Sequence, residues 1–107
     1  MPYVVLVEWK VPSRHHAAFI EAVANLVQGN PQPYRGLLSA TFHRSADGNR
    51  IINYARWKSR KAWESSFEAP GRAEATAAIQ KVVRSYGAKS LGVEGFHVGR
   101  VVDCGRG

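Results

Sequence analysis

An asparagine and a tryptophan stand four residues apart in a run that is typical of a β-strand. The run is Ile51-Ile52-Asn53-Tyr54-Ala55-Arg56-Trp57. Because side chains alternate between the two faces of a strand, Asn53 and Trp57 point to one face, with the small Ala55 between them. A carboxamide donates and accepts hydrogen bonds, and an indole offers a flat apolar surface with one N–H donor. The pair could form a wall of a pocket, or it could be an ordinary part of a sheet.

Other kinds of chemistry find little support in the sequence. His15 and His16 are adjacent and would diverge on a helix, whereas His43 and His97 fall on different predicted strands. A metal site built in three dimensions from His43, His97 and a carboxylate stays open. The glycines precede no helix at the spacing of a phosphate-binding loop. Cys104 has no histidine in sequence reach, so we do not expect a thiol nucleophile. We therefore expect neither a metal nor a cofactor.

The composition is that of one globular domain. At 107 residues the chain can bury a core, and its hydrophobic and charged fractions, 45% and 21%, are ordinary for a soluble protein. No apolar run approaches the roughly 18 residues of a membrane span, and no secretory signal precedes the first predicted strand. A single cysteine cannot form an internal disulfide. These features predict a cytoplasmic protein without a membrane partner.

The formal net charge of +7 raises the question of nucleic-acid binding. The lysines and arginines are spread along the chain, however, and the densest group, at residues 56–61, straddles a predicted strand end and a helix start. No nucleic-acid-binding module is recognised. We expect a solvated basic surface and no nucleic-acid partner.

Hydrophobic spacing predicts four strands and three helical segments. β-Branched and aromatic residues predict strands at 3–10, 37–44, 50–58 and about 95–102, and a polar turn at 46–49 joins the second to the third. Helical spacing runs from Ser13 to Gly29, from Ser59 to the Pro70-Gly71 interruption, and onward to Gly87. Ser13 and Ser59 are the predicted N-caps. The tail at 103–107 is expected to be frayed.

The resulting order, β-α-β-β-α-β with the second helical region split in two, predicts an α+β ferredoxin-like fold. Residues 1–107 would form one domain, with an antiparallel sheet and helices on one face. The other face would be apolar and bare in a monomer, so we expect a homodimer whose sheets pack face to face. The residues predicted for that face are Ile52, Tyr54, Arg56, Leu38, Ala40 and Phe42.

The pocket candidates are therefore aromatic and amide side chains rather than metal ligands or nucleophiles. Asn53 and Trp57 are the candidates for catalysis, and the candidates for substrate binding are Trp63, His43, Phe67 and Trp9. Each has a plainer interpretation: Trp57 and Trp63 can be core residues, and His43 can be a surface or core histidine instead of a general base. The sequence leaves open which of Glu8 and Trp9 turns inward.

The segment GLLSATFHRSADGNRIINYARWKSRKAW, residues 36–63, resembles the antibiotic biosynthesis monooxygenase family. The resemblance is carried by the Ser-Ala-Thr-aromatic-His run at 39–43, the Asp-Gly turn, and the Asn-Tyr-Ala-x-Trp run at 53–57. It is greatest to the small monooxygenases of aromatic polyketide pathways of the actinorhodin type. The close similarity covers about a third of the chain. It implies a dimeric ferredoxin-like α+β barrel.

What the resemblance implies about function is specific. The protein would be a cofactor-independent monooxygenase of antibiotic biosynthesis that oxidises an aromatic, anthrone-type phenol to a quinone with O2. The deprotonated substrate would supply the electrons, while the protein binds it, excludes water and stabilises the carbanion or enolate. By position, Asn53 would bind a substrate oxygen or the developing peroxide through a hydrogen bond. Trp57 would line the cavity and orient the ring.

The resemblance is broken at two positions of the helical region. Trp63 stands where the actinorhodin-type relatives carry a tyrosine, and Thr76 stands where they carry an arginine. An indole does not exchange a proton at ordinary pH, so a tyrosine-dependent proton relay is lost or moved. The alternative function is a non-oxidative dimeric α+β barrel, either a polyketide cyclase-type enzyme or a small-ligand binding module.

Overall fold

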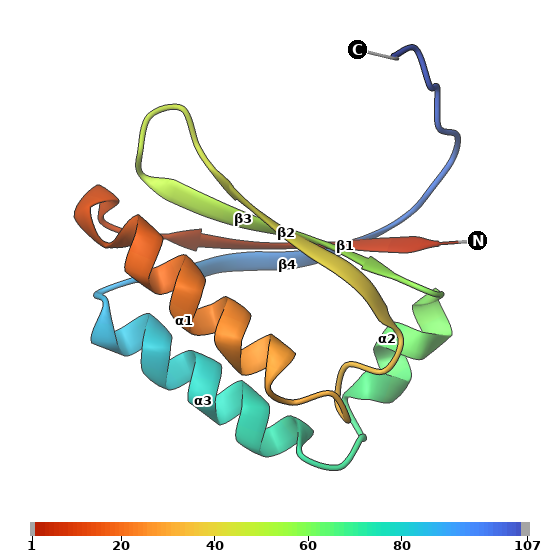
Figure 1. Cartoon of the computed structure of the whole chain (residues 1–107), viewed down its shortest axis with the longest axis horizontal. Helices are drawn as coiled ribbons and strands as arrows, with labels where there is room; N and C mark the ends of the chain where they lie inside the picture. Colours follow the sequence, from red (N-terminus) through yellow and green to blue (C-terminus); the bar gives the residue numbers. More distant parts are fainter. Residues whose placement is uncertain (1, 106–107) are drawn as a thin grey trace.

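Four antiparallel strands form one sheet, and the helices lie on one side of it (Figure 1). The structure is a computed structural model that describes residues 2–105. Its strands are β1 (Tyr3–Lys10), β2 (Leu37–Arg44), β3 (Arg50–Trp57) and β4 (Lys89–His97). Its helices are α1 (His16–Gln28), preceded by the 3-10 turn η1 (Ser13–His15), α2 (Arg60–Ser66) and α3 (Arg72–Ser85).

The strand order is β2-β3-β1-β4, and every neighbouring pair is antiparallel. β2 and β3 form a hairpin beside β1, while β4 returns to pair with the other edge of β1. This is the ferredoxin-like α+β arrangement, so the predicted fold class is confirmed. Within residues 2–105, no helix is both long and apolar enough to cross a membrane.

The hydrophobic core lies between the sheet and the two long helices. Phe19 and Val23 of α1 and Val83 of α3 pack with Trp9 and Ile51 of the sheet. Phe19 and Ile51 are both 0% exposed, so the helix-covered face of the sheet is tightly packed around these two residues. The β-branched and aromatic residues that predicted the strands are therefore the residues that hold the helices in place.

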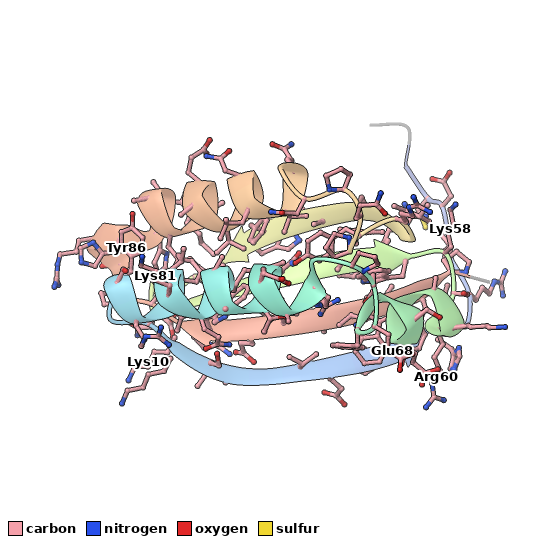
Figure 2. The ribbon with its side chains drawn as sticks, turned by 90° about the horizontal axis from the view of Figure 1, so that it is seen from below. Lys10, Lys58, Arg60, Glu68, Lys81 and Tyr86 are labelled. Carbon is pink, nitrogen blue, oxygen red and sulfur yellow. The ribbon has the colours of Figure 1, made fainter. Side chains whose placement is uncertain are left out.

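The sheet has two ends that are covered by different helices. Figure 2 shows α1 and α3 side by side, with Tyr86 and Lys81 at one end and Arg60 and Glu68 at the other. We call the second one the α2 end, because α2 begins three residues after β3 ends at Trp57. Tyr3, the first residue of β1, pairs with Trp57 and so lies at the α2 end as well.

The structure decides how β1 is oriented. Trp9 turns toward the helices and is 4% exposed, whereas Glu8 turns to the bare face. There its carboxylate accepts a hydrogen bond from Arg50 at 2.6 Å and forms an ion pair with it. The bare face is thus charged near the end of β1 and apolar near its start, where Val4 and Leu6 lie.

The prediction that Ala40 and Phe42 lie on the bare face is wrong. Ala40 pairs with Ala55 and Phe42 pairs with Asn53, and directly paired residues share a face of the sheet. The cause is a register shift between Leu37 and Ser39. A bulge adds one residue to the strand, and one added residue inverts the alternation of everything after it. Leu38, at the bulge, is 47% exposed.

The predicted last strand is also displaced. β4 begins at Lys89 and ends at His97, whereas apolar content predicted a strand at about 95–102. β4 is an edge strand with few buried residues. Its glycines and polar residues therefore lack the hydrophobic pattern from which a strand is predicted. Residues 98–105 form no helix or strand. Of the tail predicted to be frayed, residues 106–107 lie outside the described part of the chain.

Ser59 caps α2 as predicted, because its Oγ accepts a hydrogen bond from the backbone N–H of Ala62 at 3.0 Å. Ser13 does not cap a helix as predicted; it lies within η1. Replacing Ser59 by alanine should lower the free energy of unfolding by about 1 kcal/mol, the usual value of a lost N-cap. Urea unfolding measures this loss, with the exposed Ser65→Ala as the control. Equal stability of the two variants would contradict the capping role.

Candidate functional site

Asn53 lies in the middle of β3 with its side chain turned toward the helices. Its cross-strand partners are Val7 of β1 and Phe42 of β2, both of which pack against the core. The Oδ1 atom of Asn53 is buried and has no hydrogen-bond partner, and no other buried side-chain nitrogen or oxygen within residues 2–105 is left unpaired. An unpaired buried polar group costs about 1–3 kcal/mol. Asn53 is therefore costly to the fold where it stands.

A low floor of two alanines separates Asn53 from Trp57. Ala55 and its partner Ala40 face the helices and carry only methyl groups, so little side chain rises from the sheet between the amide and the indole. A cavity of about 280 Å³ opens beside this floor, between α1 and β2. Its walls are formed by Ala24, Val27, Gln28, Leu37, Leu38, Ser39, Ala40 and Phe42.

This cavity reaches the neighbourhood of Asn53 without containing it. Phe42 lines the cavity and is also the cross-strand partner of Asn53. Its volume lies just below the roughly 300–1,000 Å³ of typical small-molecule sites.

Four aromatic side chains gather at the α2 end of the sheet. Tyr3 and Trp57 are buried there, at 6% and 4% exposure. Trp63 of α2 lies against Tyr3, with ring centroids 5.7 Å apart, and against Phe67, at 5.2 Å. Gly95 of β4 makes room for this cluster, because a Cβ at that position would overlap the Tyr3 phenol. The cluster is apolar and forms a continuous wall from the sheet to α2.

A guanidinium group lies beside this wall. Arg72, the first residue of α3, has its Cζ 4.3 Å from the centroid of the Phe67 ring and 5.6 Å from that of Tyr34. Its Nη1 donates to Ser66 Oγ at 2.6 Å and its Nε donates to Thr76 Oγ1 at 3.3 Å. Tyr34 in turn lies against Trp57, at 6.5 Å between centroids. Tyr34 therefore bridges Arg72 and the buried indole.

Burial shifts the pKa values of both Tyr34 and Arg72. It raises the pKa of Tyr34 above its usual value of 10.0, and the charge of Arg72 offsets only part of this rise. Burial likewise lowers the pKa of Arg72, and Tyr34 offsets part of that change. An arginine stays charged in proteins even so. At neutral pH the pair is a neutral phenol beside a cation.

The structure brings some of the predicted site residues together and separates others. Asn53 and Trp57 share one face as predicted, and Trp63 and Phe67 extend that side of the protein at the α2 end. His43 pairs with Ile52, so it lies on the opposite face and is exposed. Trp9 is enclosed in the core, against Phe19 and Phe42.

A larger cavity, of about 430 Å³, lies on the bare face of the sheet. Val4, Leu6, Tyr54, Arg56 and Phe96 form its floor, and residues 98–101 form one side. The sheet itself separates it from the Asn53 side chain, and none of its lining residues holds a buried polar atom without a partner. We therefore place the candidate site on the helix-covered face, despite the smaller cavity there.

Two residues of the site escaped the sequence reasoning. Tyr34 sits in a proline-rich loop, and Arg72 follows the Pro70-Gly71 interruption; neither lies in a periodic pattern. The only available signal was that Tyr34 is an aromatic residue in a loop between rigid elements. Among residues 2–105, no three His, Cys, Asp or Glu side chains are grouped so that they could hold a metal ion.

A known protein family matches most of the chain. Residues 2–78 match the model of the family described as antibiotic biosynthesis monooxygenase. A curated protein, the tetracenomycin F1 monooxygenase of Streptomyces glaucescens, is 38% identical over 50 residues, which are 47% of this chain. The chain spans only 38% of the length of that relative.

Solved structures with the same fold cover nearly the whole chain. A monooxygenase of Streptomyces coelicolor in complex with nanaomycin D is 27% identical, with a TM-score of 0.67, over 95% of this chain and 92% of its own. SnoaB, a cofactor-independent oxygenase from Streptomyces nogalater, is 18% identical, with a TM-score of 0.65, over 94% of this chain and 96% of its own. At 18% identity, the similarity to SnoaB shows a shared fold and no more.

Proposed function

Because the chain belongs to the antibiotic biosynthesis monooxygenase family, we propose that it is a cofactor-independent monooxygenase that oxidises an anthrone-type phenol to a quinone with O2. The similarity to the tetracenomycin F1 monooxygenase and to the Streptomyces coelicolor monooxygenase that binds nanaomycin D supports an aromatic polyketide as the substrate class. In this reaction one oxygen atom enters the quinone and the other leaves as water. The substrate supplies all the electrons, so no external reductant is needed.

The single observation that carries this proposal is the buried, unpaired Oδ1 of Asn53. A fold under selection for stability alone would replace such a group with an apolar residue, because its burial costs about 1–3 kcal/mol. A substrate hydroxyl would donate to Oδ1, and the amide N–H of the same side chain would donate to an oxygen that becomes negative. Such donors stabilise charge that develops in the transition state.

The apolar surroundings of Asn53 fit the same role. Only the methyl groups of Ala40 and Ala55 lie on the sheet between the amide and the indole of Trp57. Ala55 is itself buried, so a flat ring system would bind there by displacing the side chains that now cover it. Trp63 and Phe67 extend the aromatic surface toward solvent. Closing a planar phenol into this space would exclude water and strengthen the hydrogen bonds of the amide. We assign Asn53 and Trp57 to catalysis and orientation, and Trp63 and Phe67 to binding.

The direct test uses protein that has been dialysed against a chelator. Anthrone added in air should be converted to anthraquinone with one O2 consumed for each quinone formed, measured with an oxygen electrode and by absorbance. Urea-unfolded protein is the control for spontaneous oxidation of the anthrone. An absence of oxygen uptake above that control, for anthrone and for hydroxylated anthrones, would overturn the proposal.

One observation favours the alternative, a non-oxidative binding module or cyclase. The cavity between α1 and β2 does not contain Asn53, so a ligand could occupy it without meeting the amide. In that case the protein would bind a hydroxyanthraquinone tightly, or cyclise a polyketide chain, equally well under nitrogen and in air. Oxygen dependence of product formation therefore separates the two functions.

We also propose that the protein is a homodimer whose sheets pack through their bare faces. The large cavity on this face is lined mainly by apolar side chains, and the rings of Tyr54 and Phe96 are 39% and 42% exposed. An apolar surface of this kind is usually covered in solution. Two copies packed face to face would bury it symmetrically.

Replacing Tyr54 by aspartate should convert the dimer to a monomer, because a carboxylate from each protomer would have to be desolvated in the interface. Light scattering after gel filtration should give twice the chain mass of 11.8 kDa for the native protein and the chain mass for Tyr54→Asp. Ala77→Asp, on the exposed side of α3, is the control and should remain dimeric. A native protein with the mass of one chain would contradict the dimer.

A further inference from the structure

Arg72 differs from the other cations of this basic protein in being partly buried. Every other lysine and arginine among residues 2–105 is exposed, whereas Arg72 is of intermediate exposure. The ion pairs within these residues are Arg50–Glu8 and Arg60–Glu64, so Arg72 has no carboxylate partner there. A desolvated charge without a counter-charge is costly. No anionic group among the described residues compensates the charge of Arg72, so a bound anion would stabilise it.

The surroundings hold this guanidinium in place without neutralising it. Ser66, which is 5% exposed, accepts a hydrogen bond from Nη1 and donates its own hydroxyl to the carbonyl oxygen of Trp63. Thr76 accepts from Nε. These two bonds occupy two of the five N–H groups of a guanidinium, and three remain for another partner. Both acceptors are neutral hydroxyls, so the positive charge is positioned but not compensated.

Neither the helix nor its neighbours offset this charge. Arg72 is the first residue of α3, at the positive end of the helix dipole, where a cation is disfavoured. The acidic residue of that turn, Glu74, is exposed and forms no ion pair with Arg72. Tyr34, whose ring centroid lies 5.6 Å from the guanidinium carbon, carries no negative charge at neutral pH, because its usual pKa of 10.0 is raised further by burial.

The rings around Arg72 indicate the shape of the missing partner. Phe67 packs against the guanidinium at 4.3 Å and is itself 52% exposed, which leaves ring surface free for a ligand. Tyr34 links the guanidinium to Trp57. Flat aromatic surfaces and an unpaired guanidinium together suit a planar molecule that bears a negatively charged oxygen.

We propose that Arg72 is the counter-charge for an ionised oxygen of the substrate, which is therefore a planar aromatic bound as its phenolate, enolate or carboxylate. The inference rests on the proposed function in placing this anion in the same site as Asn53. Arg72 would hold the ionised oxygen at the α2 end, beside the ring of Tyr34. Binding the anion would retain substrate that has already lost the proton whose removal precedes reaction with O2.

The test is spectroscopic and needs no turnover. The probe is 2-hydroxyanthraquinone, whose visible band moves to longer wavelength when its phenol ionises. The native protein should bind the probe with the band of the anion at a pH where the free probe is neutral. Arg72→Gln should bind it at least on the order of tenfold more weakly and with the neutral band, as expected for a lost charge-assisted hydrogen bond. Arg72→Lys should retain the ionised band.

Arg84→Gln, an exposed arginine in the last turn of the same helix, is the matched control and should bind like the native protein. Thermal unfolding of each variant shows whether it is folded. Failure of the native protein to bind the probe as its anion, or an unchanged affinity and spectrum in Arg72→Gln, would overturn the inference. Loss of oxygen uptake with an intact Arg72-dependent spectrum would instead count against the monooxygenase function alone.

Discussion

Replacing Asn53 by alanine is expected to lower kcat for quinone formation by on the order of tenfold or more, because the amide stabilises charge that exists only in the transition state. The free energy of unfolding should change little. The variant loses packing around the side chain, but it also loses a buried oxygen that has no partner. These two effects have opposite signs and similar size, each of about 1–3 kcal/mol. Steady-state oxygen uptake and urea unfolding measure the two quantities.

Asn25→Ala provides the matched control for this substitution, because Asn25 is exposed on α1, away from the buried face of β3. Its turnover should equal that of the native protein. If Asn53→Ala kept full activity, the unpaired oxygen would have no part in the reaction. If it unfolded the protein, the amide would be a structural residue.

Replacing Trp57 by alanine should destabilise the fold by roughly 3–5 kcal/mol, the usual cost of removing a buried tryptophan. Trp57 is 4% exposed and packs with Tyr3, Val5 and Ala55. A small domain has only about 5–15 kcal/mol of stability in total. Much of the Trp57→Ala protein should therefore unfold at moderate temperature, as followed by circular dichroism.

Trp57→Phe separates the packing of this residue from its role in the site. A phenyl ring should keep most of the stability but lacks the indole N–H, and it offers a smaller surface to a flat substrate. We expect KM to rise and kcat to fall in this variant. Phe19→Leu, in the closed core beneath α1, is the control for a general loss of packing. An unchanged kcat and KM in Trp57→Phe would contradict the binding role of the indole.

Local patterns sufficed for most of the fold. β1 and β2 have their predicted bounds, and β3 ends one residue earlier than predicted, because alternating apolar residues and the Asp-Gly turn are local signals. β4 was misplaced because an edge strand with little burial needs few apolar residues. The face of β2 was misassigned because a bulge near Leu37 has no clear sequence signature.

Only some residues of the candidate site could be predicted from the sequence. Asn53 and Trp57 belong to one strand, and strand periodicity placed them on one face. Arg72 and Tyr34 come from segments 38 residues apart that meet only in the folded chain, as the contact between the guanidinium and the Tyr34 ring shows. His43 was grouped with Asn53 by its position in a motif, yet cross-strand pairing puts it on the other face.

The central claim is that the interior around Asn53 performs an O2-dependent oxidation without a cofactor. Incubation of chelator-treated protein with anthrone under oxygen-18 gas, followed by mass spectrometry of the quinone, tests it most directly. One labelled oxygen atom should appear in each quinone formed, at a rate that falls by on the order of tenfold or more in Asn53→Ala. A quinone without label, or a labelled quinone formed equally fast by Asn53→Ala, would contradict the account.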